Sequence, residues 1–532
     1  MRKLVFTWCS VVCLLAAGNS AFSADDKPLI YCSEGSPTGF DPSQSTSGID
    51  FTANTLTVYN RLVEFEHGGT KVVPALATSW ESSADGRSYT FHLRNGVKFQ
   101  TTDYWKPTRN LNADDVVFSF ERMLSPNSSF QKAYPVSFPY LSDLGMDRLI
   151  KTVTKVDDHT VRFDLNGTSA PFIQNMAMGF ASILSKEYAD HLLQEGRAAD
   201  INQFPIGTGP FSFKSYTKDS TVRFDANNNY WDPNAVQVKR LIFSITPDAA
   251  VRAEKLKRNE CQVIAAPRPS DLATLQSDPA ITMPSEPGYN LAYLAFNVTK
   301  KPFDNPDVRR ALALALDRAA ITKSVYQGAA QVADSAMPPT QWSYKKSVSF
   351  KQDIDVAKSL LAKAGYPNGF DATLYVTSVQ RTYNPNPLLM AEMIQSDWSK
   401  VNVRVKIESF ELGELLKRLR SGQHDVALAG WIGDNGDPDN WLGNLLSCAA
   451  VNGSNYTKWC NQDFDALIQR GRTTLSINDR IKDYQNAQDI FGSQLPFIPI
   501  STFNFYQPKR KDVIGMKLEP LGYYRFDGVS LK

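Results

Sequence analysis

Two polar loops carry the residues of this sequence that are best suited to hold a charged small molecule. One loop contains Arg381 and the other contains Asp434, with the aromatic residues Tyr383 and Trp431 beside them. A guanidinium binds a carboxylate through two parallel hydrogen bonds, and a carboxylate binds an ammonium group. A cation and an anion that face the same crevice would therefore suit a zwitterion.

Each of these loops follows a segment that is predicted to be a strand. Residues 372–377 precede the Arg381 loop, and residues 425–430 precede the Asp434 loop. In α/β sheets, ligands bind beyond the carboxyl ends of the strands. Taken alone, Arg381 would more often be a solvated charge and Asp434, close to Gly436, a turn-forming residue. Their shared position after strands favours a binding clamp.

Motifs for catalysis or metal binding are sparse. No two of the five histidines lie three or four residues apart, so no helical metal pair is present: His67, His92, His159, His191 and His424. Ser129 and Lys132 have the spacing of a serine acylase but lack its companion motifs, and Asp437 and Asp439 lack the residue order of a calcium loop. We expect a binding protein without metal or cofactor, and not an enzyme. A secreted peptidase and a chaperone-like protein stay as alternatives.

The length and the net charge of the chain limit the number of domains and the kinds of partner that are expected. A chain of 532 residues is too long for one core, so two or more domains are expected. A formal net charge of +2 provides no basic field for nucleic acid or for an anionic membrane.

The first residues are typical of a secretory signal peptide. Two basic residues precede an apolar run over residues 4–17, and small residues predict cleavage near Ser23 and Ala24. The run is too short for a stable membrane anchor. Asn19 occupies the position where a lipoprotein would carry its lipidated cysteine. We therefore expect a soluble, exported protein with residues 1–23 removed.

Four cysteines remain after the predicted cleavage: Cys32, Cys261, Cys448 and Cys460. An even number in an exported chain predicts two disulfides, for which three pairings are possible. Cys448 with Cys460 is favoured because it closes a short polar loop, and this leaves Cys32 with Cys261. The spacings are not those of redox motifs, so both bonds are expected to be structural.

The predicted elements divide the chain into two kinds of region. Up to about residue 285 strand and hairpin signals dominate, as in the alternating segments 89–93 and 161–165, with a helix between them that Asn112 would cap. After Gly288, strands and helices alternate, as is typical of an α/β layer. The predicted strands are 289–296, 372–377, 403–407 and 425–430. One helix is predicted to start near residue 305, and three others are predicted at 356–364, 390–400 and 412–419.

The simplest architecture has two lobes joined by two crossings. Residues 24–288 and 504–532 would form lobe one, and residues 289–503 would form lobe two, with crossings at 289–297 and 496–504.

Long colinear stretches of the chain resemble the peptide-binding class of ABC-transporter solute receptors, and within it the receptors for dipeptides. The stretches are residues 31–37, 75–99, 111–118, 206–211 and 430–440, so the likeness extends over essentially the whole mature chain. The resemblance implies a two-lobe hinged periplasmic-binding-protein fold of α/β type, class II-like, with an extra subdomain inserted in lobe one at about residues 62–207. It also implies a periplasmic monomer that passes its ligand to an inner-membrane ABC permease. Its disulfide pattern matches Cys32–Cys261 and Cys448–Cys460.

The resemblance also assigns roles to single residues. Asp434 would bind the amine of a dipeptide and Arg381 its carboxylate. A loop of lobe one would touch the ligand backbone through Thr46, Ser47 and Gly48. The cleft would also be lined by Tyr383, Gly430 and Trp431.

Related receptors of this class carry other ligands, namely longer or antimicrobial peptides, haem, nickel complexes or chitin-derived sugars. The Arg–Asp pair favours a peptide over a sugar, and the scarcity of histidine argues against a metal. Haem stays an alternative. The segment 382–389 departs from the dipeptide receptors, so the pocket there can differ in size.

Overall fold

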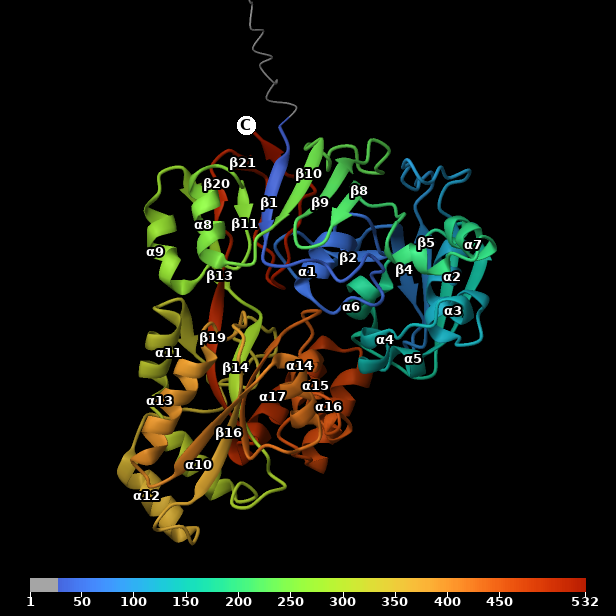
Figure 1. Cartoon of the computed structure of the whole chain (residues 1–532). Helices are drawn as coiled ribbons and strands as arrows, with labels where there is room; N and C mark the ends of the chain where they lie inside the picture. Colours follow the sequence, from blue (N-terminus) through green and yellow to red (C-terminus); the bar gives the residue numbers. More distant parts are fainter. Residues whose placement is uncertain (1–26) are drawn as a thin grey trace, which may run out of the picture.

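The computed structural model describes residues 27–532, so the predicted signal peptide and its cleavage site lie outside the described residues. Figure 1 shows two α/β lobes, one above the other, with the end of the chain in the upper lobe. Among residues 27–532, no helix is both long and apolar enough to cross a membrane.

Lobe one is built on a seven-stranded sheet with the order β12-β20-β11-β1-β10-β9-β8. β1 runs parallel to β10 and β11, and the other neighbours are antiparallel. The strands are β1 (Leu29–Ser33), β8 (Phe211–Thr217), β9 (Thr221–Ala226), β10 (Arg240–Ile245), β11 (Val263–Ile264), β12 (Ile281–Thr282) and β20 (Lys509–Arg510). The sheet therefore combines strands from both ends of the chain.

A smaller four-stranded sheet, β4-β5-β7-β6, lies beside the main sheet of lobe one, on the right in Figure 1. The predicted strands at 89–93 and 161–165 are confirmed as members of this sheet. Its strands are β4 (Ala77–Ser82), β5 (Ser88–Leu93), β6 (Ile150–Asp157) and β7 (Thr160–Leu165). The helices α2 (Ala113–Leu124) and α7 (Lys186–Gln194) belong to the same part of lobe one.

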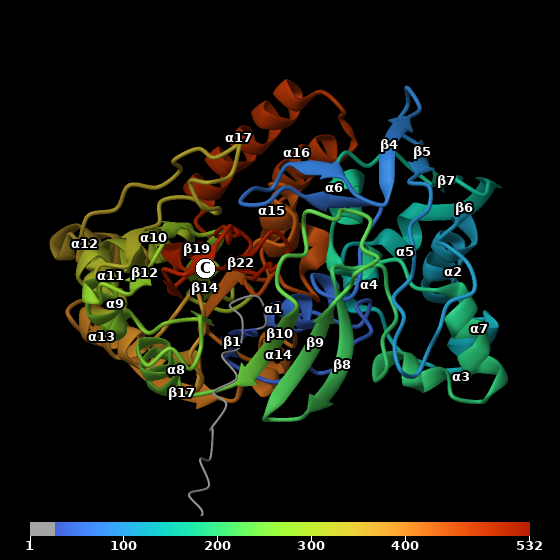
Figure 2. The ribbon, with the colours of Figure 1, turned by 90° about the horizontal axis from the view of Figure 1, so that it is seen from above.

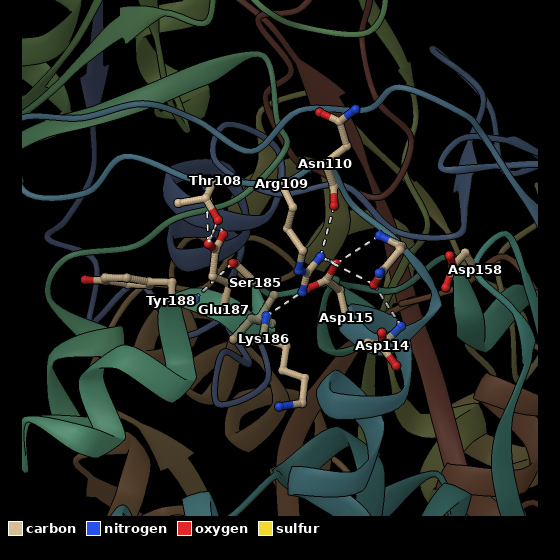
Figure 3. A network of polar contacts seen from close by, with 12 residues as sticks. Thr108, Arg109, Asn110, Asp114, Asp115, Asp158, Ser185, Lys186, Glu187 and Tyr188 are labelled. Carbon is tan, nitrogen blue, oxygen red and sulfur yellow. Dashed lines mark hydrogen bonds and ion pairs between the residues drawn. The ribbon is translucent and has the colours of Figure 1, made fainter.

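A polar network fixes α2 against α7 (Figure 3). Asn112 caps α2 as predicted, because its side chain accepts the Asp114 N–H at 3.0 Å while Asp115 accepts the Asn112 N–H at 3.0 Å. Asp115 is fully buried and also binds the Arg109 guanidinium through two bonds of 2.7 Å and the Lys186 N–H at 2.8 Å. The acidic start of α2 therefore has a structural role.

Lobe two is built on a second sheet with the order β13-β19-β14-β18-β16-β17, to which β15 adds by pairing with β19. β16 is parallel to β17 and β18, whereas β14 is antiparallel to β18 and β19. The strands are β13 (Ser285–Pro287), β14 (Asn290–Phe296), β15 (Ala330–Val332), β16 (Asp371–Thr377), β17 (Arg404–Phe410), β18 (Val426–Ile432) and β19 (Phe497–Tyr506). The strands predicted after Gly288 are confirmed.

Helices cover lobe two on both sides (Figure 1). One group consists of α10 (Pro306–Ala315), α11 (Arg318–Tyr326), α12 (Ile354–Lys363) and α13 (Pro387–Ser399). The other consists of α14 (Leu412–Arg420), α15 (Asp439–Leu446), α16 (Gln462–Thr473) and α17 (Ile477–Gln494). Asn305 caps α10 by accepting the Asp307 N–H at 2.9 Å. The helices predicted in this region are confirmed, with shifts of up to three residues at their ends.

Both predicted disulfides are present. Cys32 in β1 bonds to Cys261, which lies just before β11, and Cys448 bonds to Cys460. The first bond reinforces the parallel pairing of β1 with β11. The second closes the polar loop between α15 and α16.

Candidate ligand-binding site

A cavity of about 940 Å³ lies between the lobes and brings together all the residues predicted to bind ligand. From lobe one it is lined by Thr46, Ser47 and Gly48, and from lobe two by Arg381, Tyr383, Gly430, Trp431 and Asp434. None of the five histidines lines it. The structure places the eight predicted ligand-binding residues in one cavity, and their role in binding stays a prediction.

The strand order explains why Arg381 and Asp434 line the same cavity. Arg381 follows β16 and Asp434 follows β18, and these strands are parallel neighbours, with Leu374 paired to Val426. Their carboxyl ends therefore reach the same edge of the sheet, as expected from the strand-end rule. On lobe one, the loop before α1 (Gly48–Asp50) supplies Ser47, whose side chain accepts the Asp50 N–H at 3.1 Å.

Asp434 is an anion without a cationic partner. Its Oδ1 accepts the Tyr140 hydroxyl at 2.8 Å, and its Oδ2 accepts the Asn440 side-chain amide at 3.0 Å. No Lys, Arg or His among residues 27–532 lies within ion-pair distance of it. Burial raises the pKa of Asp434 to about 6, and the negative charge of Asp143 adds to this rise, although the two hydrogen bonds oppose it.

Arg381 is a cation without an anionic partner. Its guanidinium carbon lies 5.9 Å from the centre of the Tyr383 ring, and its buried Nε has no hydrogen-bond partner. No Asp or Glu of the described chain lies within ion-pair distance of it. A reciprocal pair of backbone hydrogen bonds with Asn384, of 2.9 and 3.0 Å, holds the loop that carries Arg381. The cavity thus contains opposite charges that an added zwitterion could neutralise.

The residues around these two charges pack closely. A β-carbon at Gly430 would lie 2.2 Å from the Tyr383 ring, so position 430 has room for glycine only. The Tyr326 hydroxyl donates to the Tyr383 backbone carbonyl at 2.6 Å, which holds the backbone that carries the ring. The Trp431 indole N–H donates to the Asn440 side-chain oxygen Oδ1 at 3.0 Å, and the side-chain NH2 of the same Asn440 donates to Asp434.

Sequence reasoning missed Tyr140, Asp143 and Asn440. Tyr140 and Asp143 come from α4 (Pro139–Asp143) in lobe one and line the same cavity as Asp434. No local pattern identifies them, because Tyr140 is 294 residues away from its partner Asp434. Asn440, six residues after Asp434, could have been suspected because it is a polar residue in the first turn of α15.

The other chemical candidates from the sequence have structural explanations. Both oxygens of Asp437 accept from one Arg480 nitrogen at 2.8 Å, and Asp439 pairs with Arg472 at 2.7 Å. These ion pairs occupy the carboxylates that a calcium loop would need. Ser129 and Lys132 are exposed on α3 (Ser129–Ala133) and do not line the cavity.

Two α/β lobes around a central cavity with unpaired charges define a solute-binding protein. Residues 71–453 match the family described as "Bacterial extracellular solute-binding proteins, family 5 Middle". The chain belongs to this family of bacterial extracellular solute-binding proteins, and it is therefore a binding protein and not an enzyme.

Curated relatives and solved structures match almost the whole chain. The chain is 53% identical over 519 residues to "Di/tripeptide-binding protein 1" of Pseudomonas aeruginosa, covering 97% of this chain and 96% of the relative. It is 43% identical to "Heme-binding protein A" of Haemophilus influenzae, covering 97% and 94%. A dipeptide-binding protein of Pseudoalteromonas sp. SM9913, solved with Met-Leu, superposes with a TM-score of 0.85 at 38% identity and covers 95% of this chain and 100% of that one.

Proposed function

We propose that this protein is the solute receptor of an ABC importer and that it binds dipeptides and other short peptides by their charged termini. The observation that carries the proposal is the pair of uncompensated charges, Arg381 and Asp434, that line one cavity from the ends of neighbouring strands. The relative named for di- and tripeptides and the solved complex with Met-Leu support a peptide as the ligand.

The two charges would select a ligand by its length. Asp434 would hold the ammonium group and Arg381 the carboxylate, and burying either terminus without a partner would be costly. Each added residue moves the ends of an extended peptide about 3.5 Å farther apart, so a longer ligand must bend to satisfy both charges. The cavity of about 940 Å³ leaves room for varied side chains and for water.

The remaining site residues would shape the ligand path. Thr46, Ser47 and Gly48 would contact the peptide backbone from lobe one, while Tyr383, Gly430 and Trp431 would line the cleft from lobe two. All of them line the same cavity, which supports this assignment.

The placement of the protein in the cell is part of the same proposal. The chain would be exported to the periplasm, cleaved near Ser23 and Ala24, and would act as a monomer that delivers peptide to an inner-membrane permease. Lobe one would consist of residues 24–288 and 504–532, with the subdomain at about 62–207, and lobe two of residues 289–503. The antiparallel pairing of β14 with β19 supports the two predicted crossings, whereas β13 and the last residues of β19 extend the lobe-two sheet a few residues beyond these bounds.

Calorimetry with matched ligands tests the proposed function. A free dipeptide should bind, whereas its N-acetyl form and its C-terminal amide should each bind at least about a hundredfold more weakly, because each leaves one buried charge unpaired. Asp434→Ala and Arg381→Ala should each remove roughly 3–5 kcal/mol of binding. Equal binding of blocked and free peptides, or losses below tenfold in both variants, would contradict the proposal.

Haem is the second candidate ligand, because a relative with 43% identity is named for haem. Titration with haem, followed by its Soret absorption, separates the two candidates. Native mass spectrometry of the purified protein would identify either ligand directly, since a bound molecule adds its own mass.

A further inference from the structure

The lobes also touch at a second place, outside the ligand cavity. Three pairs of residues, one residue of each pair from lobe one and one from lobe two, make this contact: Gly86 with Leu475, Ala170 with Arg472, and Asn175 with Asn435. None of these residues lines the cavity. We call this contact the closure seam. Figures 1 and 2 both show α6 (Phe172–Met176), which carries Asn175, next to α15 and α16 of lobe two.

The closure seam consists of specific contacts. The Asn435 side-chain amide donates to the Asn175 side-chain oxygen Oδ1 at 2.7 Å, and the two residues are only 2% and 5% exposed. The Ala170 N–H donates to the Arg472 carbonyl at 2.7 Å. At the outer end, the Leu475 methyl groups lie 3.2 Å from the place where a β-carbon of Gly86 would be.

The closure seam holds the segment that carries Asp434, residues 433–440, which we call the anchor loop. Asn435 directly follows Asp434, so the hydrogen bond that Asn435 donates to Asn175 is made one residue away from the proposed amine site. At the far end of the anchor loop, Arg472 binds Asp439 at 2.7 Å while its carbonyl accepts from Ala170 of lobe one. Between these points, Gly436 is so close to Thr70 of lobe one that a β-carbon would lie 2.5 Å from it.

We propose that the closure seam is a latch between the lobes and that Asn175 is a positioning residue for the anchor loop. This inference rests on the proposed function, since it concerns the affinity of the same site. The apparent dissociation constant of a receptor equals its intrinsic value divided by the fraction of molecules in the binding-competent state. In this proposal the binding-competent state is the arrangement in which both lobes line the cavity. Contacts that favour this arrangement without touching the ligand therefore raise the affinity for every ligand by the same factor.

Two variants separate the latch from the ligand site. Asn175→Ala leaves the buried Asn435 amide without its acceptor, and Leu475→Asp removes the methyl groups that lie beside Gly86 and puts a charged carboxylate in their place. Each should weaken the binding of Ala-Ala, Met-Leu and Lys-Glu by the same factor, about tenfold, mainly through faster dissociation. Val156→Asp is the matched control, because Val156 is as exposed as Leu475, at 57% against 48%, and lies on β6 outside the closure seam.

The readouts distinguish the possible failures. Small-angle scattering of the ligand-free variants should show a larger radius of gyration than the unmodified protein and the control. Unchanged dissociation constants in both seam variants would overturn the latch, and so would a changed ranking of the three peptides, which would place Asn175 at the ligand. If the unmodified protein binds no peptide, the proposed function fails, and the scattering comparison still tests the latch.

Discussion

The ring of Tyr383 occupies the space that a side chain at Gly430 would need: a β-carbon there would lie 2.2 Å from Tyr383 Cδ2. Tyr383 belongs to the loop of Arg381, and Gly430 belongs to the strand that leads to Asp434. Gly430 therefore lets the Arg381 loop approach β18 closely, and this approach helps to set the spacing between Arg381 and Asp434.

Gly430→Ala should weaken peptide binding at least about tenfold, because the methyl group displaces the Tyr383 ring and with it the Arg381 loop. Calorimetry measures the loss, and a small change in melting temperature would show that the fold is intact. The effect should shrink in a Tyr383→Ala background, where the space is free. Gly167→Ala is the control, since no atom lies within 4 Å of a β-carbon there; an equal loss in that variant would refute the packing argument.

Peptide binding should weaken as the pH falls below about 6. In the ligand-free protein Asp434 has a pKa of about 6, and only its ionised form attracts an ammonium group. Below that pH the affinity should fall toward tenfold per pH unit, because the carboxyl must lose its proton when the ligand binds. Calorimetry between pH 5 and 8 tests this, with Asp434→Asn as the variant that should lose the dependence. A flat profile in the unmodified protein would show that Asp434 does not meet the amine.

The same carboxylate should lower the stability of the ligand-free protein. A raised pKa means that the folded state holds the proton more tightly than the unfolded state, so the penalty is present above about pH 6 and disappears toward the ordinary pKa near 3.8. Asp434→Asn should therefore be about 1–2 kcal/mol more stable than the unmodified protein at pH 7.5. Urea unfolding at pH 7.5 and pH 4.5 measures the difference, which should vanish at the lower pH. A variant that is less stable at pH 7.5 would contradict this account.

His67 should stabilise the fold at neutral pH and lose this effect in alkali. It contacts Asp527 at 2.9 Å and Glu519 at 3.6 Å, and although burial opposes protonation, these carboxylates raise the pKa of His67 to about 9. The stabilisation is complete below the unfolded pKa of about 6.5 and disappears as the pH rises through about 9. His67→Gln should cost about 1 kcal/mol at pH 6 and almost nothing at pH 10. The exposed His159→Gln is the control, and a cost independent of pH would indicate packing instead of charge.

Local patterns predicted the elements of the fold, but they could not predict partners from distant parts of the chain. The apolar run before Asp434 and the capping residue Asn112 are decided by neighbours in sequence, and both β18 and α2 form as expected. The position of Arg381 and Asp434 on one cavity followed from the rule that the carboxyl ends of parallel strands lie at one edge of the sheet. Tyr140 and Asn175 could not be found in this way, because their partners Asp434 and Asn435 lie 294 and 260 residues away, in the other lobe.

The short strand β20 lies between β11 and β12 in the sheet of lobe one, although it is made of Lys509 and Arg510. Every other strand of that sheet lies before residue 283. The lobe-two sheet, whose last strand ends at Tyr506, can thus form while the lobe-one sheet still lacks one of its inner strands. Until Lys509 and Arg510 pair, β11 has an unpaired edge, and a chain that ended before residue 509 would leave that edge open to pairing with another strand.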